Sequence, residues 1–216
     1  YPIPDSFKGD KVHGFMQADG HVGGFDGTFM LDTGAPGWAF LDKMGSEKSG
    51  LWTSGQPYAP TQSRGFGRGG VPTRLYRLDR MKLYKFVLQN PLVAVTKPSA
   101  GLGEFRHVDG LIGLKALRYF HMSWSAKDKQ LYLKPNGLSA PKDDDYPLSG
   151  LWFERKGDAI LIEDVGIGSP AAAAGLMVGD EVRGQGWDAL LAAVNGKAGE
   201  TVAFDYVRAG KAGRAE

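Results

Sequence analysis

The chain has 216 residues, of which 42% are hydrophobic and 11% aromatic, enough apolar material for one large or two small domains with cores of their own. The 26 basic and 24 acidic residues give a net charge of only +2, and the basic residues are scattered, so the composition does not indicate nucleic-acid binding. The sequence has no cysteine, which excludes disulfides and thiol catalysis, and no run of roughly 20 apolar residues that could span a bilayer.

Residues 1–135 have the sequence texture of an all-β domain. Short apolar runs, such as Tyr84–Leu88 and Pro91–Val95, alternate with turns rich in Gly, Pro, Asp and Asn. One short helix is predicted over Leu114–Phe120, where large apolar residues recur every three positions. A glycine-rich stretch, Ser63–Gly70, interrupts the predicted strands.

A hairpin and a linker are predicted to end this region. His121–Ser125 and Gln130–Lys134 alternate with period two around the polar residues Ala126–Lys129, which is typical of a hairpin. Residues 136–148 then concentrate turn formers and charge with little to bury. We therefore interpret them as a linker between two domains.

Residues 149–216 change to a mixed pattern of strands and helices. Ser169 followed by Pro170 is a typical helix start, and Gly175 is placed to end that short helix. A longer helix is expected near Trp187–Val194. Strands are expected at Ala159–Ile162 and Thr201–Val207. The stretch Lys211–Glu216 is short and polar, so no complete final strand is expected there.

The triplet Asp32-Thr33-Gly34 carries the most chemical information. It follows three apolar residues, Phe29–Leu31, so a buried strand would deliver the carboxylate into a turn. A carboxylate can hydrolyse a peptide without a metal if it shares a proton with a second carboxylate, one acting as base toward water and the other as acid. The threonine hydroxyl can hold the loop, and the glycine lets backbone N–H groups approach the carboxylate closely.

A second apolar segment, Leu111-Ile112-Gly113, leads into the predicted helix downstream. With these two segments, residues 15–135 resemble a retropepsin-like aspartic protease domain, an acid-protease β-barrel. The resemblance implies that Asp32 is catalytic, with Thr33 and Gly34 framing it. It also implies that Ala35, Leu111, Ile112 and Gly113 support the site. The chain holds one Asp-Thr-Gly, whereas the family's chemistry needs two carboxylates, so the resemblance implies a homodimeric endopeptidase acting on peptide or protein substrates without a cofactor.

The glycine-rich stretch between the two segments is interpreted as a flap over the substrate. The predicted flap residues are Gly65, Phe66, Gly67, Arg68 and Gly69. Their G-x-G-x-x-G spacing is followed by Val71-Pro72 and not by a helix start, so a dinucleotide site is not favoured. The interleaved arginines form one short run inside a β domain, so RNA binding is not favoured either.

Other catalytic arrangements find little support. The four histidines show no metal-ligand spacing and no Gly-x-Ser-x-Gly is present, so neither a metal site nor a serine nucleophile is predicted. Three further Asp-Gly pairs, at Asp19, Asp26 and Asp109, lack the hydroxyl residue between Asp and Gly. Two of them are typical of hairpin turns, and we assign Asp109 no catalytic role.

The stretch Gly166–Val182 is similar to a PDZ domain of the bacterial protease-associated type, a β-sandwich or barrel with two helices. Such domains bind an extended peptide as an added strand beside their second helix. The resemblance assigns the groove to Gly150, Leu151, Trp152, Phe153, Leu190 and Leu191. Trp152 stands where many relatives carry glycine, and tryptophan adopts positive φ only at high cost, so capture of a C-terminal carboxylate is not expected.

Two functions remain open from the sequence. In the first, the PDZ domain recruits or positions protein substrates for a dimeric aspartic endopeptidase. In the second, the protease fold is catalytically inactive and the chain is a peptide-binding adaptor that works through its PDZ domain. The sequence begins at Tyr1 without a methionine, so upstream residues have been removed, by processing or in preparing the chain. Processing of an export signal would make the protein periplasmic or secreted.

Overall fold

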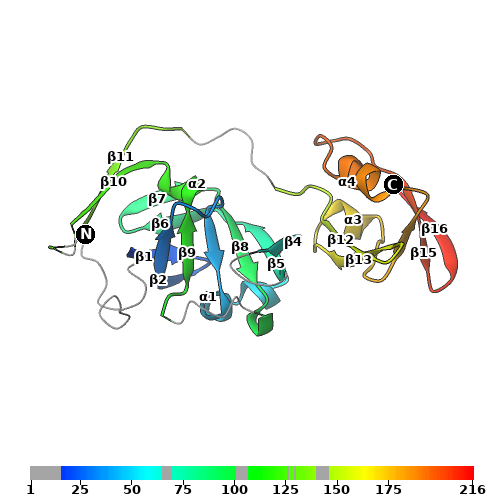
Figure 1. Ribbon diagram of the computed structural model, residues 1–216, viewed down its shortest axis with the longest axis horizontal. Helices are drawn as coiled ribbons and strands as arrows, with labels where there is room; N and C mark the ends of the chain where they lie inside the picture. Colours follow the sequence, from blue (N-terminus) through cyan, green and yellow to red (C-terminus); the bar gives the residue numbers. More distant parts are fainter. Residues whose placement is uncertain (1–15, 65–69, 101–106, 126, 129, 140–145) are drawn as a thin grey trace. The chain divides into compact units, whose positions relative to one another are not determined.

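The computed structural model describes residues 16–64, 70–100, 107–125, 127–128, 130–139 and 146–216 (Figure 1). They form a mainly β protein, as the sequence predicts. The chain divides into two compact units, the first made of residues 1–54 and 62–144 and the second of residues 55–61 and 145–216. Among the described residues, no helix combines the length and apolar character that a membrane crossing requires.

Nine strands form one mixed sheet with the order β4-β5-β8-β3-β9-β2-β1-β6-β7, and all of them except β4 lie entirely in the first unit. The strands are β1 Gln17–Val22, β2 Phe25–Asp32, β3 Ala39–Leu41, β4 Ala59–Ser63, β5 Val71–Arg77, β6 Arg80–Leu83, β7 Phe86–Gln89, β8 Leu92–Thr96 and β9 Gly110–Gly113. β2 pairs with β9 in parallel, and β3 pairs with β8 in parallel. The β2–β9 pairing brings two distant sequence segments side by side at the middle of the sheet (Figure 1).

The hairpin between β1 and β2 turns at two glycines that the sequence analysis did not single out. Gly23 and Gly24 have φ values of 64° and 89°, which suits the tight two-residue turn of a twisted hairpin. None of the three other Asp-Gly pairs turns a hairpin, so that prediction was wrong. Asp19 and Asp26 lie within β1 and β2, and the third pair leads into β9.

The apolar residues before Asp32 belong to the core of this unit. Phe29 on β2, Leu41 on β3 and Ile112 on β9 are each 0% exposed. β9 lies between β2 and β3 in the sheet, so the three side chains come from adjacent strands. Asp32 therefore follows directly on a buried stretch of β2.

A helix that the sequence analysis missed, α1 (Lys43–Ser49), packs inside the first unit. Its sequence contains one glycine and two serines, which have weak helix propensity, so local signals did not reveal it. Tertiary contacts require these small residues. A Cβ atom on Gly45 would lie 2.0 Å from the Asp109 carbonyl oxygen, and the buried Ser46 hydroxyl donates to the Thr96 carbonyl at 2.7 Å.

The end of the first unit follows the prediction in outline. The predicted hairpin is confirmed as the separate two-stranded sheet of β10 (Phe120–Ser125) and β11 (Gln130–Pro135). The helix α2 is shorter than predicted, Leu114–Leu117, because Phe120 already begins β10. Two short 3₁₀ helices, η2 (Leu51–Thr53) and η3 (Pro98–Ala100), complete the unit.

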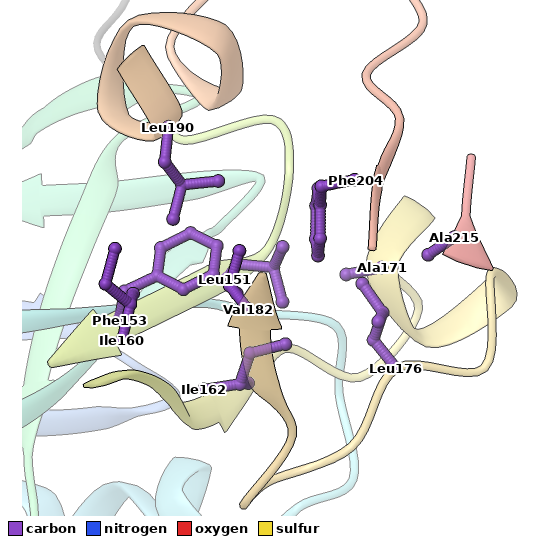
Figure 2. Close-up of a cluster of buried hydrophobic side chains, with 10 residues drawn as sticks. All are labelled: Leu151, Phe153, Ile160, Ile162, Ala171, Leu176, Val182, Leu190, Phe204 and Ala215. Atoms are coloured by element: carbon purple, nitrogen blue, oxygen red, sulfur yellow. The ribbon is translucent and has the colours of Figure 1, made fainter. Parts of the chain in front are cut away.

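The second unit contains a five-stranded antiparallel sheet and two helices. Its strands follow in chain order across the sheet: β12 Leu151–Lys156, β13 Ala159–Val165, β14 Glu181–Arg183, β15 Phe204–Arg208 and β16 Lys211–Ala215. The helices are α3 (Pro170–Ala173) and α4 (Trp187–Val194). Figure 2 shows the core that joins them, made of Leu151, Phe153, Ile160, Ile162, Ala171, Leu176, Val182, Leu190, Phe204 and Ala215.

The helix signals of the second unit are confirmed. Ser169 caps α3, where its hydroxyl accepts the Ala172 N–H at 3.2 Å, and Pro170 occupies the first helical position. The expectation about the last strand was wrong, because Lys211–Ala215 forms β16. Ala209 and Gly210, at φ 47° and 77°, make a two-residue turn that returns the chain onto β15 despite the polar sequence.

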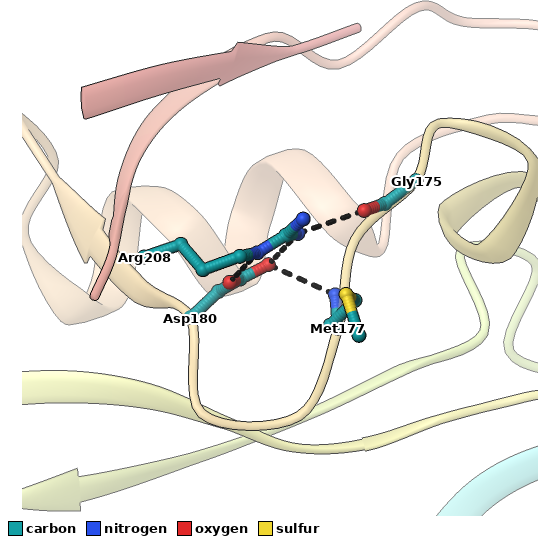
Figure 3. A network of polar contacts seen from close by, with 4 residues as sticks. All are labelled: Gly175, Met177, Asp180 and Arg208. Atoms are coloured by element: carbon teal, nitrogen blue, oxygen red, sulfur yellow. Dashed lines mark hydrogen bonds and ion pairs between the residues drawn. The ribbon is translucent and has the colours of Figure 1, made fainter. Parts of the chain in front are cut away.

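A buried carboxylate connects β14 and β15 outside the apolar core (Figure 3). Asp180 is 1% exposed and accepts hydrogen bonds from Arg208 Nε at 2.6 Å and Nη2 at 2.7 Å. It also accepts the Met177 N–H at 2.8 Å, and Arg208 Nη2 donates to the Gly175 carbonyl at 2.8 Å. The hydrogen bonds from Arg208 hold the pKa of the Asp180 carboxyl below its ordinary value, although burial opposes this shift.

Candidate active site

Asp32 is the last residue of β2 and begins a tight turn. The residue is half-buried, and its Oδ1 accepts the Gly34 N–H at 2.8 Å. The Ala35 N–H donates to the Asp32 carbonyl at 3.3 Å, which closes the turn. Thr33 and Gly34 are exposed. The buried strand therefore presents one carboxylate at a surface turn, and a backbone N–H holds its orientation.

The end of β9 braces this turn through backbone groups. Gly113 lies opposite Asp32 in the parallel pairing. A Cβ atom on Gly113 would lie 2.5 Å from the Gly37 carbonyl oxygen and 2.8 Å from that of Ala35, so only glycine fits without a shift of the backbone. The structure thus brings the two predicted site segments, separated by about 80 residues, into direct contact.

Three hydrogen bonds fix the relative positions of these segments. The Gly113 N–H donates to the Trp38 carbonyl at 2.9 Å, Leu114 N–H to Ala35 at 2.8 Å, and Lys115 N–H to Gly37 at 3.0 Å. The first N–H groups of a helix have no partner within the helix. Here the N–H groups at the start of α2 donate to backbone carbonyls of the residues that follow Asp32. The start of the helix and the turn therefore stabilise each other.

Two aromatic residues beside the turn were missed by the sequence analysis. Trp38 is 6% exposed and stacks on Tyr119 with ring centroids 5.7 Å apart. Burial raises the pKa of the Tyr119 hydroxyl, an effect that the nearby Arg118 partly offsets. The sequence offers one signal for this packing: a tryptophan, Trp38, stands four residues after the Asp-Thr-Gly triplet.

Asp109 has a structural place behind the site. It is 4% exposed, accepts the Thr28 N–H at 3.0 Å, and pairs with Lys48 Nζ at 2.6 Å. It therefore links α1 to β2 just before β9 begins. Nothing in these contacts directs its carboxylate to Asp32.

Within the described residues, the Asp32 carboxylate is hydrogen-bonded to Gly34 N–H and to no second carboxylate. The described part of the chain also holds no cluster of three His, Asp or Glu residues that could bind a metal ion. One copy therefore supplies one oriented carboxylate, which can act as a base but cannot by itself form an acid–base pair. The predicted flap, Gly65–Gly69, lies outside the described residues.

The residues predicted for a peptide groove take different positions in the second unit. Phe153 and Leu190, at 5% and 0% exposure, belong to the core, while Leu191 and Trp152 are half-buried. Gly150 precedes β12 with φ 71°, and a Cβ atom there would lie 2.1 Å from Ser169 Cβ. Trp152 lies in β12 without positive φ, beside a shift in the β12–β13 register, so the cost of positive φ expected for it does not arise.

The comparison with protein families points to one class. Residues 18–116, a little under half of the chain, match the family model described as aspartyl protease. No curated protein matches the chain. Among solved structures, it is similar to the crystal structure of a retropepsin-like aspartic protease from Rickettsia conorii, with 23% identity and a TM-score of 0.40 over 56% of this chain and 80% of that one.

Proposed function

We propose that the chain is an aspartic endopeptidase that works as a homodimer, in which each subunit contributes one Asp32. The observation that carries the proposal is the turn at the end of β2, where β9 and α2 brace a single carboxylate beside the exposed Thr33 and Gly34. The family match over residues 18–116 supports the class of enzyme.

In the dimer, the two Asp32 carboxylates share one proton. Two like charges about 3 Å apart repel strongly, and a shared proton relieves that repulsion. The ionised Asp32 takes a proton from water, which attacks the peptide carbonyl, while the protonated Asp32 donates to the carbonyl oxygen. Gly34 N–H orients each carboxylate. In the proposed dimer, Thr33 of each subunit contacts the opposite turn.

The second unit acts in this proposal as a PDZ domain that recruits or positions protein substrates. The linker, 136–148, connects it to the protease domain. In the alternative function, the chain is an adaptor: its PDZ domain binds peptides, and the protease fold does not cleave them.

Cleavage of a denatured protein by the full chain tests the proposal. We expect cleavage to persist in a chelator and to fall by at least about 100-fold in Asp32→Asn. Asp26→Asn is the matched control, because Asp26 lies on the same strand with its side chain 93% exposed and pairs only with His21 among the described residues. Activity per chain should also fall on dilution as sedimentation shows the dimer dissociating. Equal cleavage by Asp32→Asn, or full activity from a monomer, would refute the proposal.

A further inference from the structure

A cavity of about 530 Å³ opens on the second unit between the start of β12, α3 and the end of α4. This volume lies within the usual range of small ligand pockets. Its floor is the apolar core: Leu151, Ala171, Leu176, Phe204 and Ala215, all labelled in Figure 2, line it. Leu148 at the rim is 49% exposed. The cavity can therefore accept an apolar side chain without disturbing a polar network.

The mouth of the cavity carries more negative than positive charge. Glu200 and Glu216 line it together with one basic residue, Lys197. The Lys197 N–H donates to Glu200 Oε2 at 2.9 Å, which holds that carboxylate at the mouth. The last turn of α4 also ends there without a basic residue, so its C-terminal partial charge adds to the negative potential.

Several backbone donors beside the cavity already have acceptors. Ala171 N–H donates to the Ser149 carbonyl at 3.2 Å and Ala172 N–H to Ser169 Oγ at 3.2 Å. Leu151 N–H is directed to Ser149 Oγ at 3.4 Å, and Pro170 has no N–H. A carboxylate entering the cavity would have to displace these acceptors as well as approach Glu200.

We infer that this cavity binds an apolar side chain from the interior of an extended segment that also carries lysine or arginine, and that it discriminates against a free C-terminal carboxylate. The inference rests on the proposed role of the second unit in peptide recruitment. It assigns the class of segment recognised: apolar stretches with basic neighbours, as unfolded proteins expose, and not chain termini.

Binding of three fluorescent peptides to the full chain tests this inference. All contain Leu-Phe. The first is amidated with Leu-Phe central and lysines on both sides, the second replaces the lysines by glutamates, and the third ends in Leu-Phe with a free carboxylate after lysines. Asp32→Asn is the host for every measurement, so cleavage does not remove the peptide. We expect the first peptide to bind about tenfold more tightly than either of the others.

Matched variants locate the site. Ala174→Phe should weaken the first peptide by at least about tenfold, since Ala174 is exposed and lines the cavity. Ala172→Phe should not, because Ala172 is exposed on α3, the helix that Ala174 caps, and does not line the cavity. Glu200→Gln keeps an acceptor for Lys197 N–H and should reduce the lysine-over-glutamate preference about threefold, whereas Glu181→Gln should leave it unchanged.

Three results would overturn the inference: no binding of the first peptide, equal or tighter binding of the third, or equal effects of Ala174→Phe and Ala172→Phe. Each is independent of catalysis. A chain that cleaves through Asp32 but fails these tests would retain the proposed protease activity, while a chain that passes them without cleaving would be the adaptor.

Discussion

The Asp180–Arg208 pair should contribute much of the stability of the second unit, and Asp180→Asn tests this. The two carboxylate oxygens now accept from Arg208 Nε at 2.6 Å and from Nη2 at 2.7 Å. Asparagine keeps one of these acceptors and replaces the other by an NH₂ group, which faces an N–H of Arg208. Loss of a hydrogen bond to a charged group costs about 1.5–3 kcal/mol. Because the Arg208 side chain is 37% exposed, water compensates for part of this loss, and we expect about 2 kcal/mol.

Hydrogen exchange on the full chain can measure this loss inside the second unit. The Ile162 N–H donates to the Asp180 carbonyl and the Gly179 N–H to the Ile162 carbonyl, so both amides report on opening beside the substituted residue. A loss of about 2 kcal/mol makes their exchange roughly 30-fold faster. Asp205→Asn is the matched control: Asp205 is 57% exposed and pairs with Arg214, so a change within about 0.5 kcal/mol is expected.

Acid should abolish the difference between the wild type and Asp180→Asn. The pKa of Asp180 is lower in the folded state than its ordinary value of about 3.9, chiefly through the Arg208 hydrogen bonds, so the unfolded chain binds the proton more tightly. The stabilisation is therefore fully present above about pH 4 and is lost as pH falls through the folded pKa. Equal exchange rates in Asp180→Asn and Asp205→Asn at neutral pH would refute this account of the pair.

Three further substitutions test the packing. Gly45→Ala should destabilise the first unit by about 2 kcal/mol in thermal unfolding, because its methyl group would meet the Asp109 carbonyl; unchanged stability would mean that α1 can shift. Ser169→Ala should cost the second unit about 1 kcal/mol, read as faster exchange at the start of α3, through loss of the helix cap. Leu190→Ala should cost about 3 kcal/mol in denaturant unfolding, since the side chain is fully buried; a loss under about 1 kcal/mol would place it outside the core.

Elements with local signals were predictable from the sequence. The helix start at Ser169, the helix Trp187–Val194 and the hairpin of β10 and β11 each follow from a cap or a clear periodicity. The position of Asp32 at the end of a buried strand also follows from the apolar residues before it. These features depend on neighbours in sequence, which a sequence displays.

The missed features depend on distant contacts or on backbone angles. Gly45 and Ser46 weaken the local helix signal of α1, but these two small residues are the ones that fit against Asp109 and Thr96. β16 forms because Ala209 adopts φ 47°, a conformation that no propensity for alanine predicts. The stacking of Trp38 on Tyr119 joins residues far apart in the chain, and only the folded sheet brings them together.

The brace behind Asp32 uses main-chain atoms alone, and this has a consequence for sequence divergence. The carbonyls of Ala35, Gly37 and Trp38 accept N–H groups that every residue except proline carries. The side chain of Leu114 is 45% exposed, so its identity can change without altering the brace, whereas any side chain at Gly113 collides with the turn. Relatives with this geometry can therefore share very few residues here beyond a glycine and the aspartate that it supports.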